Sequence, residues 1–209
     1  MIENGIHLGD CMDGMAAMPD NYIDLAIVDP PYGIGRDGKP TSTSSHGGHK
    51  GYEFKGWDIA PPPKYFAELF RVSMNQVIWG ANYFCASLPV STGWVLWDKG
   101  QRIDQADGEL AFTSLSKPLR VFTLNRCAIR NDGAIHPTQK PVDLYKWLLT
   151  NYAKEGDLIL DTHMGSGSSY IACLDMGFDY IGYEIDEDYF KAINNRVYHF
   201  TRQNTLEGL

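Results

Sequence analysis

The feature that most constrains this chain is an apolar run that stops at two prolines. Residues 23–28 read Ile-Asp-Leu-Ala-Ile-Val, and Asp29-Pro30-Pro31-Tyr32 follows directly. A run that is apolar at nearly every position is typical of a parallel strand buried on both faces. Neither proline can donate a hydrogen bond to a sheet, so the strand must end there. The pattern places an acid, a rigid turn and an aromatic ring at the carboxyl end of a buried strand, where open α/β sheets bind ligands.

The residues of this turn suit the chemistry of an aromatic exocyclic amine, which is a poor nucleophile because its lone pair is delocalised into the ring. The Asp29 carboxylate can accept one N–H of such an amine, and the Pro30 carbonyl can accept the other. Two acceptors favour a pyramidal nitrogen whose lone pair is free to attack. Tyr32 offers a face on which a base can stack. The alternative is a strand-ending turn that uses Asp and Pro for geometry alone, and it leaves the aromatic ring unexplained.

A second group of residues, near the other end of the chain, predicts a βαβ unit that binds a nucleoside. A predicted strand ends in Asp161, and a glycine-containing turn with Gly165 and Gly167 leads to a helix that includes Tyr170. Glycines between a strand and a helix let the backbone pass close to a ligand at the helix N-terminus. The next predicted strand ends in Glu184, and an acid at that position suits hydrogen bonds to ribose hydroxyls.

Together these motifs resemble the amino-group DNA methyltransferases, which transfer a methyl group from S-adenosylmethionine to N6 of adenine or N4 of cytosine. Residues 29–32 are similar to the catalytic motif of the family, in the form more typical of the N6-adenine enzymes. Residues 161–168 are similar to its cofactor motif, Asp-Pro-Phe-x-Gly-Ser-Gly-Thr, with departures at Thr162, His163 and Ser168. His163 is either a cofactor contact or an aromatic replacement for Phe, and we favour the replacement.

Two further motifs extend the resemblance. Residues 136–141 read His-Pro-Thr-Gln-Lys-Pro and match the family's cofactor-flanking motif residue for residue. The resemblance suggests that Lys140 neutralises the carboxylate at the methionine end of the cofactor. Thr138, Gln139 and Lys140 are expected to be exposed donors in a loop, and spacing alone favours a capped helix start preceded by an ordinary surface lysine. In the family a Gly-Asp pair near the N-terminus approaches the cofactor's adenine, and Asp10 stands there; its alternative role is the N-cap of a helix over residues 11–18.

The resemblance therefore implies a full set of site residues. The expected catalytic residues are Asp29, Pro30, Pro31 and Tyr32. The expected cofactor contacts are Asp10, Cys11, His136, Thr138, Gln139, Lys140, Asp161, His163, Gly165, Ser166, Gly167 and Glu184. No residue is expected to bind a metal. Because the cofactor glycines follow the catalytic motif, the motif order resembles the beta type of the family, in a small form similar to phage and prophage enzymes.

The predicted elements indicate a single α/β domain over residues 1–209. Besides the strands already described, strands are expected at 6–10, 75–80, 109–113 and 120–124, a strand and turn at 93–100, and a helix at 64–74. The fold implied by the resemblance is the Rossmann-like fold of S-adenosylmethionine-dependent methyltransferases, a seven-stranded, mostly parallel sheet with helices on both faces. A flexible loop is expected at about 33–56, since a long irregular segment inside a compact domain is usually functional or disordered. A short target-recognition region is expected at about 101–130. Two predicted strand ends, at Trp79–Tyr83 and Trp97–Lys99, carry aromatic and polar groups that can line a pocket for a flipped base. Trp79 and Trp97 themselves are either walls of that pocket or core residues.

Composition limits the classes of protein that remain. The chain is 44% hydrophobic, has no apolar run of membrane-spanning length, and begins without a secretory pattern. Its four cysteines lack metal spacing, so we expect reduced thiols in a cytoplasmic protein. The net charge of −8 counts against a nucleic-acid partner. We therefore expect basic residues to gather locally, between Gly33 and Trp57 and from Lys99 onward, with modest affinity and strong salt dependence.

The sequence predicts a site-specific DNA methyltransferase that uses S-adenosylmethionine to methylate N6 of adenine, after the base has been flipped out of the duplex. Cytosine N4 and adenine in RNA are alternative acceptors. The motif order argues against a protein amide as acceptor. A cofactor-binding module without turnover is the alternative from another class, and the intact motif at 29–32 argues against it. Similar enzymes are often homodimers, and some act beside a restriction enzyme; the sequence leaves both partners open.

Overall fold

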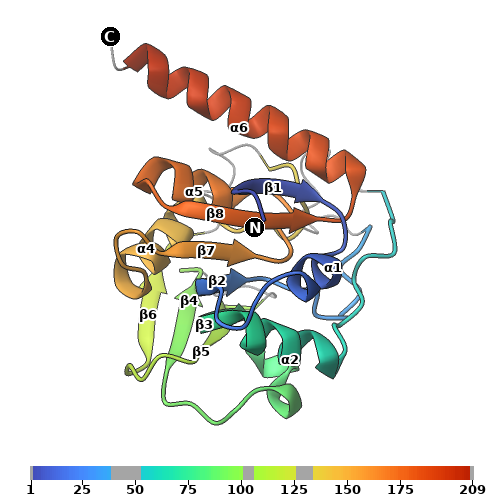
Figure 1. The fold of residues 1–209 in the computed structure, drawn as a ribbon, viewed down its shortest axis with the longest axis vertical. Coiled ribbons are helices and arrows are strands. Elements are labelled where there is room, and N and C mark those ends of the chain that lie inside the picture. The colour runs from blue at the N-terminus through green and yellow to red at the C-terminus, as the bar shows by residue number, and fades with distance from the viewer. Residues whose placement is uncertain (1, 39–52, 101–105, 126–133, 208–209) are drawn as a thin grey trace.

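The computed structural model describes residues 2–38, 53–100, 106–125 and 134–207 (Figure 1). Its strands are β1 (Gly5–Leu8), β2 (Ile23–Val28), β3 (Ser73–Trp79), β4 (Trp94–Asp98), β5 (Gly108–Thr113), β6 (Arg120–Thr123), β7 (Leu158–Asp161) and β8 (Asp179–Glu184). Its helices are α1 (Cys11–Ala16), α2 (Pro63–Val72), α4 (Val142–Tyr152), α5 (Ser168–Met176) and α6 (Glu187–Glu207), with short 3-10 helices η1 (Ala81–Tyr83) and η2 (Cys85–Ser87). Parts of the predicted loop at 33–56 and of the predicted recognition region at 101–130 lie outside the described residues.

The strands form one sheet in the order β1-β8-β7-β2-β3-β5-β4-β6. Neighbouring strands are parallel except where β5 runs antiparallel to both β3 and β4. The α/β class and the mostly parallel sheet are confirmed. The described residues form eight strands, however, where the resemblance implied seven. The difference lies at the edge of the sheet, where β4 carries β5 on one side and can still pair in parallel with the short segment Arg120–Thr123 on the other.

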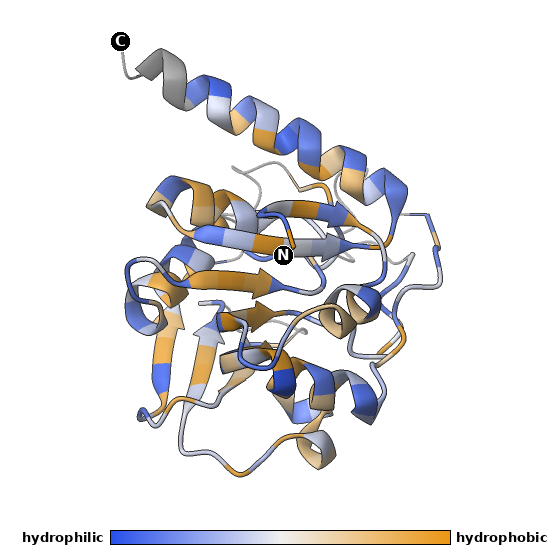
Figure 2. Cartoon of the chain, in the orientation of Figure 1, coloured by the Kyte–Doolittle hydropathy of each residue, from blue (hydrophilic) through white to orange (hydrophobic). Residues whose placement is uncertain are grey.

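Helices cover both faces of this sheet, as expected. Side chains alternate along β2, so Leu25 and Ile27 enter one core while Ala26 and Val28 enter the other. The first core is closed by α4, α5 and the start of α6, and the second by α1 and α2. Figure 2 shows the apolar strands between these more polar helices. A strand buried in this way must be apolar on both faces, which explains the nearly continuous apolar run in the sequence.

The helices follow from local patterns. In α2, Tyr65, Phe66, Leu69 and Val72 are buried and recur at helical spacing, and the helix begins at a proline, which suits a first turn. Helix α6 is 21 residues long, and its far end extends beyond the body of the molecule (Figure 1). Within the described ranges, no helix combines the length and the apolar character needed to cross a bilayer.

The topology also explains where a ligand can bind. Strands β2 and β7 are neighbours in the middle of the sheet. The chain leaves β2 toward α2 on one face, and it leaves β7 toward α5 on the other. Adjacent parallel strands whose following helices cover opposite faces leave a crevice between their carboxyl ends. The two principal sequence motifs begin on either side of this crevice.

Candidate active site

A cavity of about 820 Å³ opens at the carboxyl ends of the central strands. This volume is in the range of cofactor and substrate sites. The predicted residues that line it are Asp10, Cys11, Asp29, Pro30, Pro31, Tyr32, His136, Thr138, Gln139, Lys140, His163, Gly165, Ser166 and Glu184. Asp161 and Gly167 are absent from its wall. Motifs up to about 170 residues apart in the chain therefore meet at one cavity.

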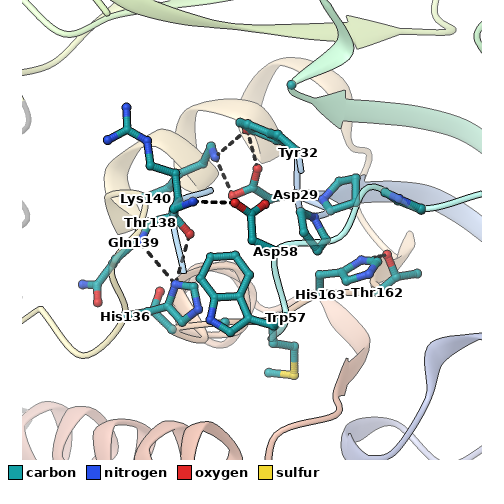
Figure 3. A pocket seen from close by; sticks show the side chains of 18 of the residues that line it. Asp29, Tyr32, Trp57, Asp58, His136, Thr138, Gln139, Lys140, Thr162 and His163 are labelled. Carbon is teal, nitrogen blue, oxygen red and sulfur yellow. Dashed lines mark hydrogen bonds and ion pairs between the residues drawn. The ribbon is translucent and has the colours of Figure 1, made fainter. Parts of the chain in front are cut away.

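Asp29 lies directly after β2, and both of its carboxylate oxygens accept hydrogen bonds. The Tyr32 hydroxyl donates to Oδ1 at 2.7 Å, and the Lys140 ammonium donates to Oδ2 at 2.5 Å (Figure 3). Burial raises the pKa of Asp29, and the Lys140 charge offsets part of that rise. The carboxylate is thus fixed in orientation before any ligand is present.

Lys140 is buried, with 4% of its surface exposed, rather than lying on a surface loop. Its ammonium contacts Asp29, the Glu109 carboxylate at 3.0 Å and the Tyr32 hydroxyl at 3.2 Å. The sequence suggested the cofactor's carboxylate as the partner of this lysine, whereas the carboxylates beside it are the protein's own. Pro141 forms the N-cap of α4, and Lys140, directly before it, lines the cavity.

Glu109 was missed as a candidate site residue, whereas Lys99 belongs to a strand end that was considered as a wall of the base pocket. Glu109 lies on β5 opposite Trp97, and Lys99 comes just after the end of β4; the Lys99 ammonium is 2.6 Å from Glu109. Burial alone would raise the pKa of Glu109, but the Lys140 and Lys99 charges prevail and lower it to about 2. The available signal was a lone acid in the otherwise apolar stretch of residues 109–112, because such an acid needs a cationic partner.

Asp161 and Gly167 shape the loop between β7 and α5. The Asp161 carboxylate accepts from the Ser169 hydroxyl at 2.6 Å and from the His163 amide at 3.0 Å. Burial raises the pKa of Asp161 to about 7. Gly167 is the N-cap of α5 with φ 71°, and an added Cβ would lie 2.7 Å from Ile193. Both residues support the loop from behind the cavity wall.

Glu184 ends β8 and holds the same loop from the other side. Its Oε2 accepts from the Gly165 amide at 2.9 Å, and its Oε1 accepts from the Asp186 amide at 2.9 Å. Burial raises the pKa of Glu184. Gly165 has φ 54°, a left-handed conformation that suits glycine, and its position brings the loop backbone to the cavity.

The two site histidines are buried aromatic rings. His163 packs edge-on against Tyr65, with ring centroids 5.4 Å apart, and shares a hydrogen bond with the Thr162 hydroxyl at 2.9 Å. His136 contacts the ring of Trp57 at 5.2 Å and the ring of Tyr189 at 4.5 Å. Burial lowers the pKa of each histidine to about 4. Both rings are therefore neutral near pH 7, and Figure 3 shows them on the cavity wall.

At the N-terminal side, Asp10 is the N-cap of α1 and accepts from the Met12 amide at 2.8 Å. It also lines the cavity, so both roles considered from the sequence are open to it. Cys11 is buried in the first turn of the helix, and burial raises the pKa of its thiol to about 12. Its sulfur is therefore a neutral, apolar part of the wall.

Aromatic residues occupy the other end of the cavity. Tyr32 stacks on Tyr83, with ring centroids 5.1 Å apart and an interplanar angle of 19°. Trp97 lines the cavity and is also a core residue, whereas Trp79 is fully buried and belongs to the core alone. Tyr83 is half exposed, so one face of Tyr32 is covered by a side chain on the surface of the molecule.

The two ends of the predicted loop at 33–56 are joined by hydrogen bonds between residues 33–37 and residues 55–58, and we call these residues the neck. Residues 39–52 lie outside the described residues. The buried Asp37 carboxylate accepts from the backbone amides of Lys55, Gly56 and Trp57. Asp58 accepts from the amides of Gly33 and Arg36. The neck therefore closes the base of the loop beside the cavity.

One basic residue expected to face DNA has a different partner. The Lys55 ammonium pairs with Asp186 at 2.8 Å and with Asp188 at 2.7 Å. These acids follow Glu184, so Lys55 ties the neck to the strand end that carries the ribose-binding candidate. Lys99, also expected to be basic surface, is paired with Glu109.

The family model for DNA methylases matches residues 91–195, half of the chain. The chain belongs to the DNA methylase family. Its curated relatives include a putative methylase, YubD, of Escherichia coli (strain K12), 27% identical over 90% of this chain and 88% of the relative. The type II methyltransferase M2.MboI of Moraxella bovis is 26% identical over 93% of this chain and 87% of the relative.

Solved structures show the same fold. The M1.HpyAVI–SAM complex superposes with a TM-score of 0.61 at 20% identity, covering 91% of this chain and 98% of that one. The PvuII DNA methyltransferase, described as cytosine-N4-specific, superposes with a TM-score of 0.60 at 13% identity, covering 94% of this chain and 87% of that one. The sheet and helices of this DNA methylase therefore have the architecture of known DNA methyltransferases.

Proposed function

We propose that this DNA methylase transfers the methyl group of S-adenosylmethionine to the N6 amine of adenine in DNA. Membership of the family supports DNA methylation as the reaction. The cavity between β2 and β7 supports the cofactor, and so does the likeness to a structure determined with S-adenosylmethionine. The cofactor residues are Asp10, Gly165, Ser166 and Glu184 at the wall, with Asp161 and Gly167 holding their loop.

One observation carries the proposal: Asp29 and the glycine loop face a single cavity from neighbouring strands. When bound there, S-adenosylmethionine supplies an electrophilic methyl group on a cationic sulfur. Asp29 accepts one N–H of the target amine and the Pro30 carbonyl accepts the other, which frees the nitrogen lone pair. The nitrogen gains the methyl carbon while the carbon–sulfur electron pair stays with sulfur. The methylated nitrogen is then cationic and loses a proton, so the turn stabilises charge that develops during transfer.

Cytosine N4 is the second candidate acceptor, because the fold is shared with the PvuII enzyme. Both acceptors are exocyclic amines on aromatic rings, and the same pair of oxygens would hold either. Asp29 as the first residue of the motif favours adenine, since the resemblance associates serine at that position with many N4 enzymes. Tyr83 stacks on one face of Tyr32, so this pair must rearrange before a base of either kind can stack on that face.

Nucleoside mass spectrometry tests the proposal directly. Unmethylated genomic DNA is incubated with the protein and S-adenosylmethionine, then digested to nucleosides. We expect N6-methyladenine. N4-methylcytosine instead would keep the mechanism and overturn the acceptor. If neither product forms although the cofactor still binds, DNA methylation is contradicted. Parallel reactions on RNA would then distinguish an RNA methyltransferase from a cofactor-binding module without turnover.

The role of Asp29 is tested by Asp29→Ala. We expect turnover to fall by at least about a hundredfold, because removal of one preorganised catalytic contact typically costs 10²–10³ in rate. Cofactor affinity, measured by calorimetry, should change little, since no cofactor role is assigned to Asp29. Lys191→Ala, which removes an exposed ion pair on α6, is the control and should keep full turnover. Near-complete activity in Asp29→Ala would contradict the amine clamp.

A further inference from the structure

Four side chains of alternating charge lie in a row behind the target-amine position: Lys99, Glu109, Lys140 and Asp29. We call these four residues the charge row. The Lys99 ammonium is 2.6 Å from Glu109, the Lys140 ammonium is 3.0 Å from Glu109, and it is 2.5 Å from Asp29. The row begins after β4, crosses β5 and the segment before α4, and ends after β2. It has two cations and two anions, so its net charge is zero.

Burial makes the pairing in the row demanding. The side chains of Lys140 and Asp29 are only 3% and 15% exposed, and that of Lys99 is 12% exposed. A buried charge is tolerated when it is paired and hydrogen-bonded, and removing one partner leaves the other uncompensated. An ammonium has three hydrogen-bond donors. Lys140 has three acceptors around it, namely Asp29, Glu109 and the Tyr32 hydroxyl.

The position of Glu109 gives the row a function beyond stability. If Asp29 were the only anion beside Lys140, the two charges would neutralise each other and weaken Asp29 as an acceptor. Glu109 shares the ammonium, and Lys99 in turn compensates Glu109. Asp29 therefore keeps a counterion that orients it while retaining negative charge toward the amine, whose nitrogen becomes positive during transfer.

We propose that Glu109 and Lys99 are positioning residues that set how strongly Lys140 binds Asp29: Glu109 draws part of the ammonium away from Asp29, Lys99 compensates Glu109, and together they tune the charge and orientation of Asp29 for catalysis. The inference rests on the proposed function, because Asp29 acts in this way only toward an amine. Neither residue touches the reacting atoms in this scheme. Their effect passes mainly through Lys140, and Glu109 also lies 3.4 Å from the Tyr32 hydroxyl that donates to Asp29.

Other ionisable groups around Asp29 do not reproduce this arrangement. Tyr32 donates to Asp29, and burial keeps its hydroxyl and those of Tyr65 and Tyr145 protonated, with pKa values well above the ordinary range. Asp161, at the end of β7, opposes ionisation of Asp29 and is held by Ser169 instead of a cation. Among these neighbours, Lys140 is the cation that hydrogen-bonds Asp29.

The test is the pH profile of single-turnover methylation, because an electrostatic role must follow the sign of the charge removed. The acid limb of the profile reports ionisation of Asp29. Lys140→Met removes its counterion and should move the limb up by about 1–3 pH units, the usual effect of one adjacent charge. Lys99→Met leaves Glu109 uncompensated and should also move the limb up, by less. Glu109→Gln removes an anion and should move the limb down.

The rate at the plateau should fall in all three variants, on the order of 10- to 100-fold, as it does for outer partners of metal ligands. Lys140→Arg keeps the charge and should keep the limb near its original pH while lowering the plateau. Lys146→Met is the matched control, because Lys146 pairs with Asp175 between α4 and α5, away from the cavity. It should leave both limb and plateau unchanged.

The inference is overturned if the limbs of Lys99→Met and Glu109→Gln coincide with that of the unmodified protein, or move in the same direction. Loss of folding in Lys140→Met does not rescue it, since Lys99→Met and Glu109→Gln still decide. Absence of methylated base from the unmodified protein, or full turnover in Asp29→Ala, instead refutes the proposed function. Methylation that depends on Asp29 but shows fixed limbs refutes the positioning role alone.

Discussion

Asp161 is a buried acid whose charge is compensated by hydrogen bonds alone. Burial raises its pKa from the ordinary 3.8 to about 7, while the Ser169 hydroxyl and the His163 amide offset part of the rise. The folded chain then binds this proton more tightly than the unfolded chain does. The stability contributed by the group is full below about pH 4 and is lost as pH rises toward about 7.

Asp161→Asn cannot titrate, so it isolates this effect. Relative to the unmodified protein, the variant should gain free energy of unfolding as pH rises from 5 to 7, by at most about 1.4 kcal/mol per pH unit, and the difference should level off above 7. Urea denaturation at pH 5, 6, 7 and 8 measures it. Asp143→Asn, which removes an exposed carboxylate at the start of α4, is the control for loss of a surface acid. Parallel stability curves for Asp161→Asn would show that the carboxyl is ionised throughout.

Single residues also show where reasoning from sequence stops. Asp29 and Glu184 could be located because each ends an apolar strand, and a strand end defines a place in the sheet. The partners of Lys140 could not be located from the sequence, because Glu109 and Asp29 are 31 and 111 residues away and no local pattern joins them to Lys140. The prediction that Lys140 is exposed was wrong for the same reason. Its position in a loop does not reveal that the fold places the carboxylates of Asp29 and Glu109 beside it.

At the scale of elements, the neck of the 33–56 segment depends on one buried acid. Asp37→Ala removes the acceptor of three backbone amides, at Lys55, Gly56 and Trp57. Hydrogen bonds to charged groups contribute about 1.5–3 kcal/mol each. We expect the neck to open locally, so these amides should exchange with solvent at least about tenfold faster, since about 1.4 kcal/mol corresponds to a factor of ten.

Hydrogen exchange read by mass spectrometry measures this change. Cofactor affinity is measured separately on the same variant. Affinity should fall, because Trp57 lines the cavity and Lys55 ties the neck to the end of β8. Glu53→Ala, an exposed acid in the same segment, is the control and should leave both unchanged. Unaltered exchange at 55–57 in Asp37→Ala would mean that other contacts hold the neck.

Elements were the part of the fold most open to prediction. Every strand of the sheet corresponds to a segment recognised from apolar or β-branched residues, with ends shifted by one or two positions. The exact sheet was harder, because β4, β5 and β6 join through pairings that sequence order does not reveal. Helix α2 shows a boundary error of the same kind: it ends at Val72, and Ser73 and Met74, expected to be helical, already belong to β3.

At the scale of the whole molecule, the distribution of charge favours a modest affinity for DNA. The net charge is −8, and two basic residues expected to face DNA, Lys55 and Lys99, are neutralised by acids of the same chain. Few free cations then remain among the described residues near the cavity, of which Arg36 is one. Within the described part of the chain, the cations available for phosphate contacts near the cavity are therefore limited.

The cavity also joins much of the fold, because its wall includes residues of β4, β5 and β8, residues that follow β1, β2, β3 and β7, and residues of both helical layers. A ligand that binds only the folded state stabilises it by about 2.7 kcal/mol at a hundredfold excess over Kd. For a chain of this size that corresponds to a rise in Tm of roughly 5–10 °C. We therefore expect S-adenosylmethionine to raise the Tm by this amount in differential scanning calorimetry.

Asp29→Ala should show the same rise, since it leaves the cofactor wall intact. Glu184→Ala should lose most of it at the same ligand concentration, because the ribose-binding candidate and the acceptor of the Gly165 amide are removed together. An equal rise in Glu184→Ala would place the cofactor elsewhere in the cavity.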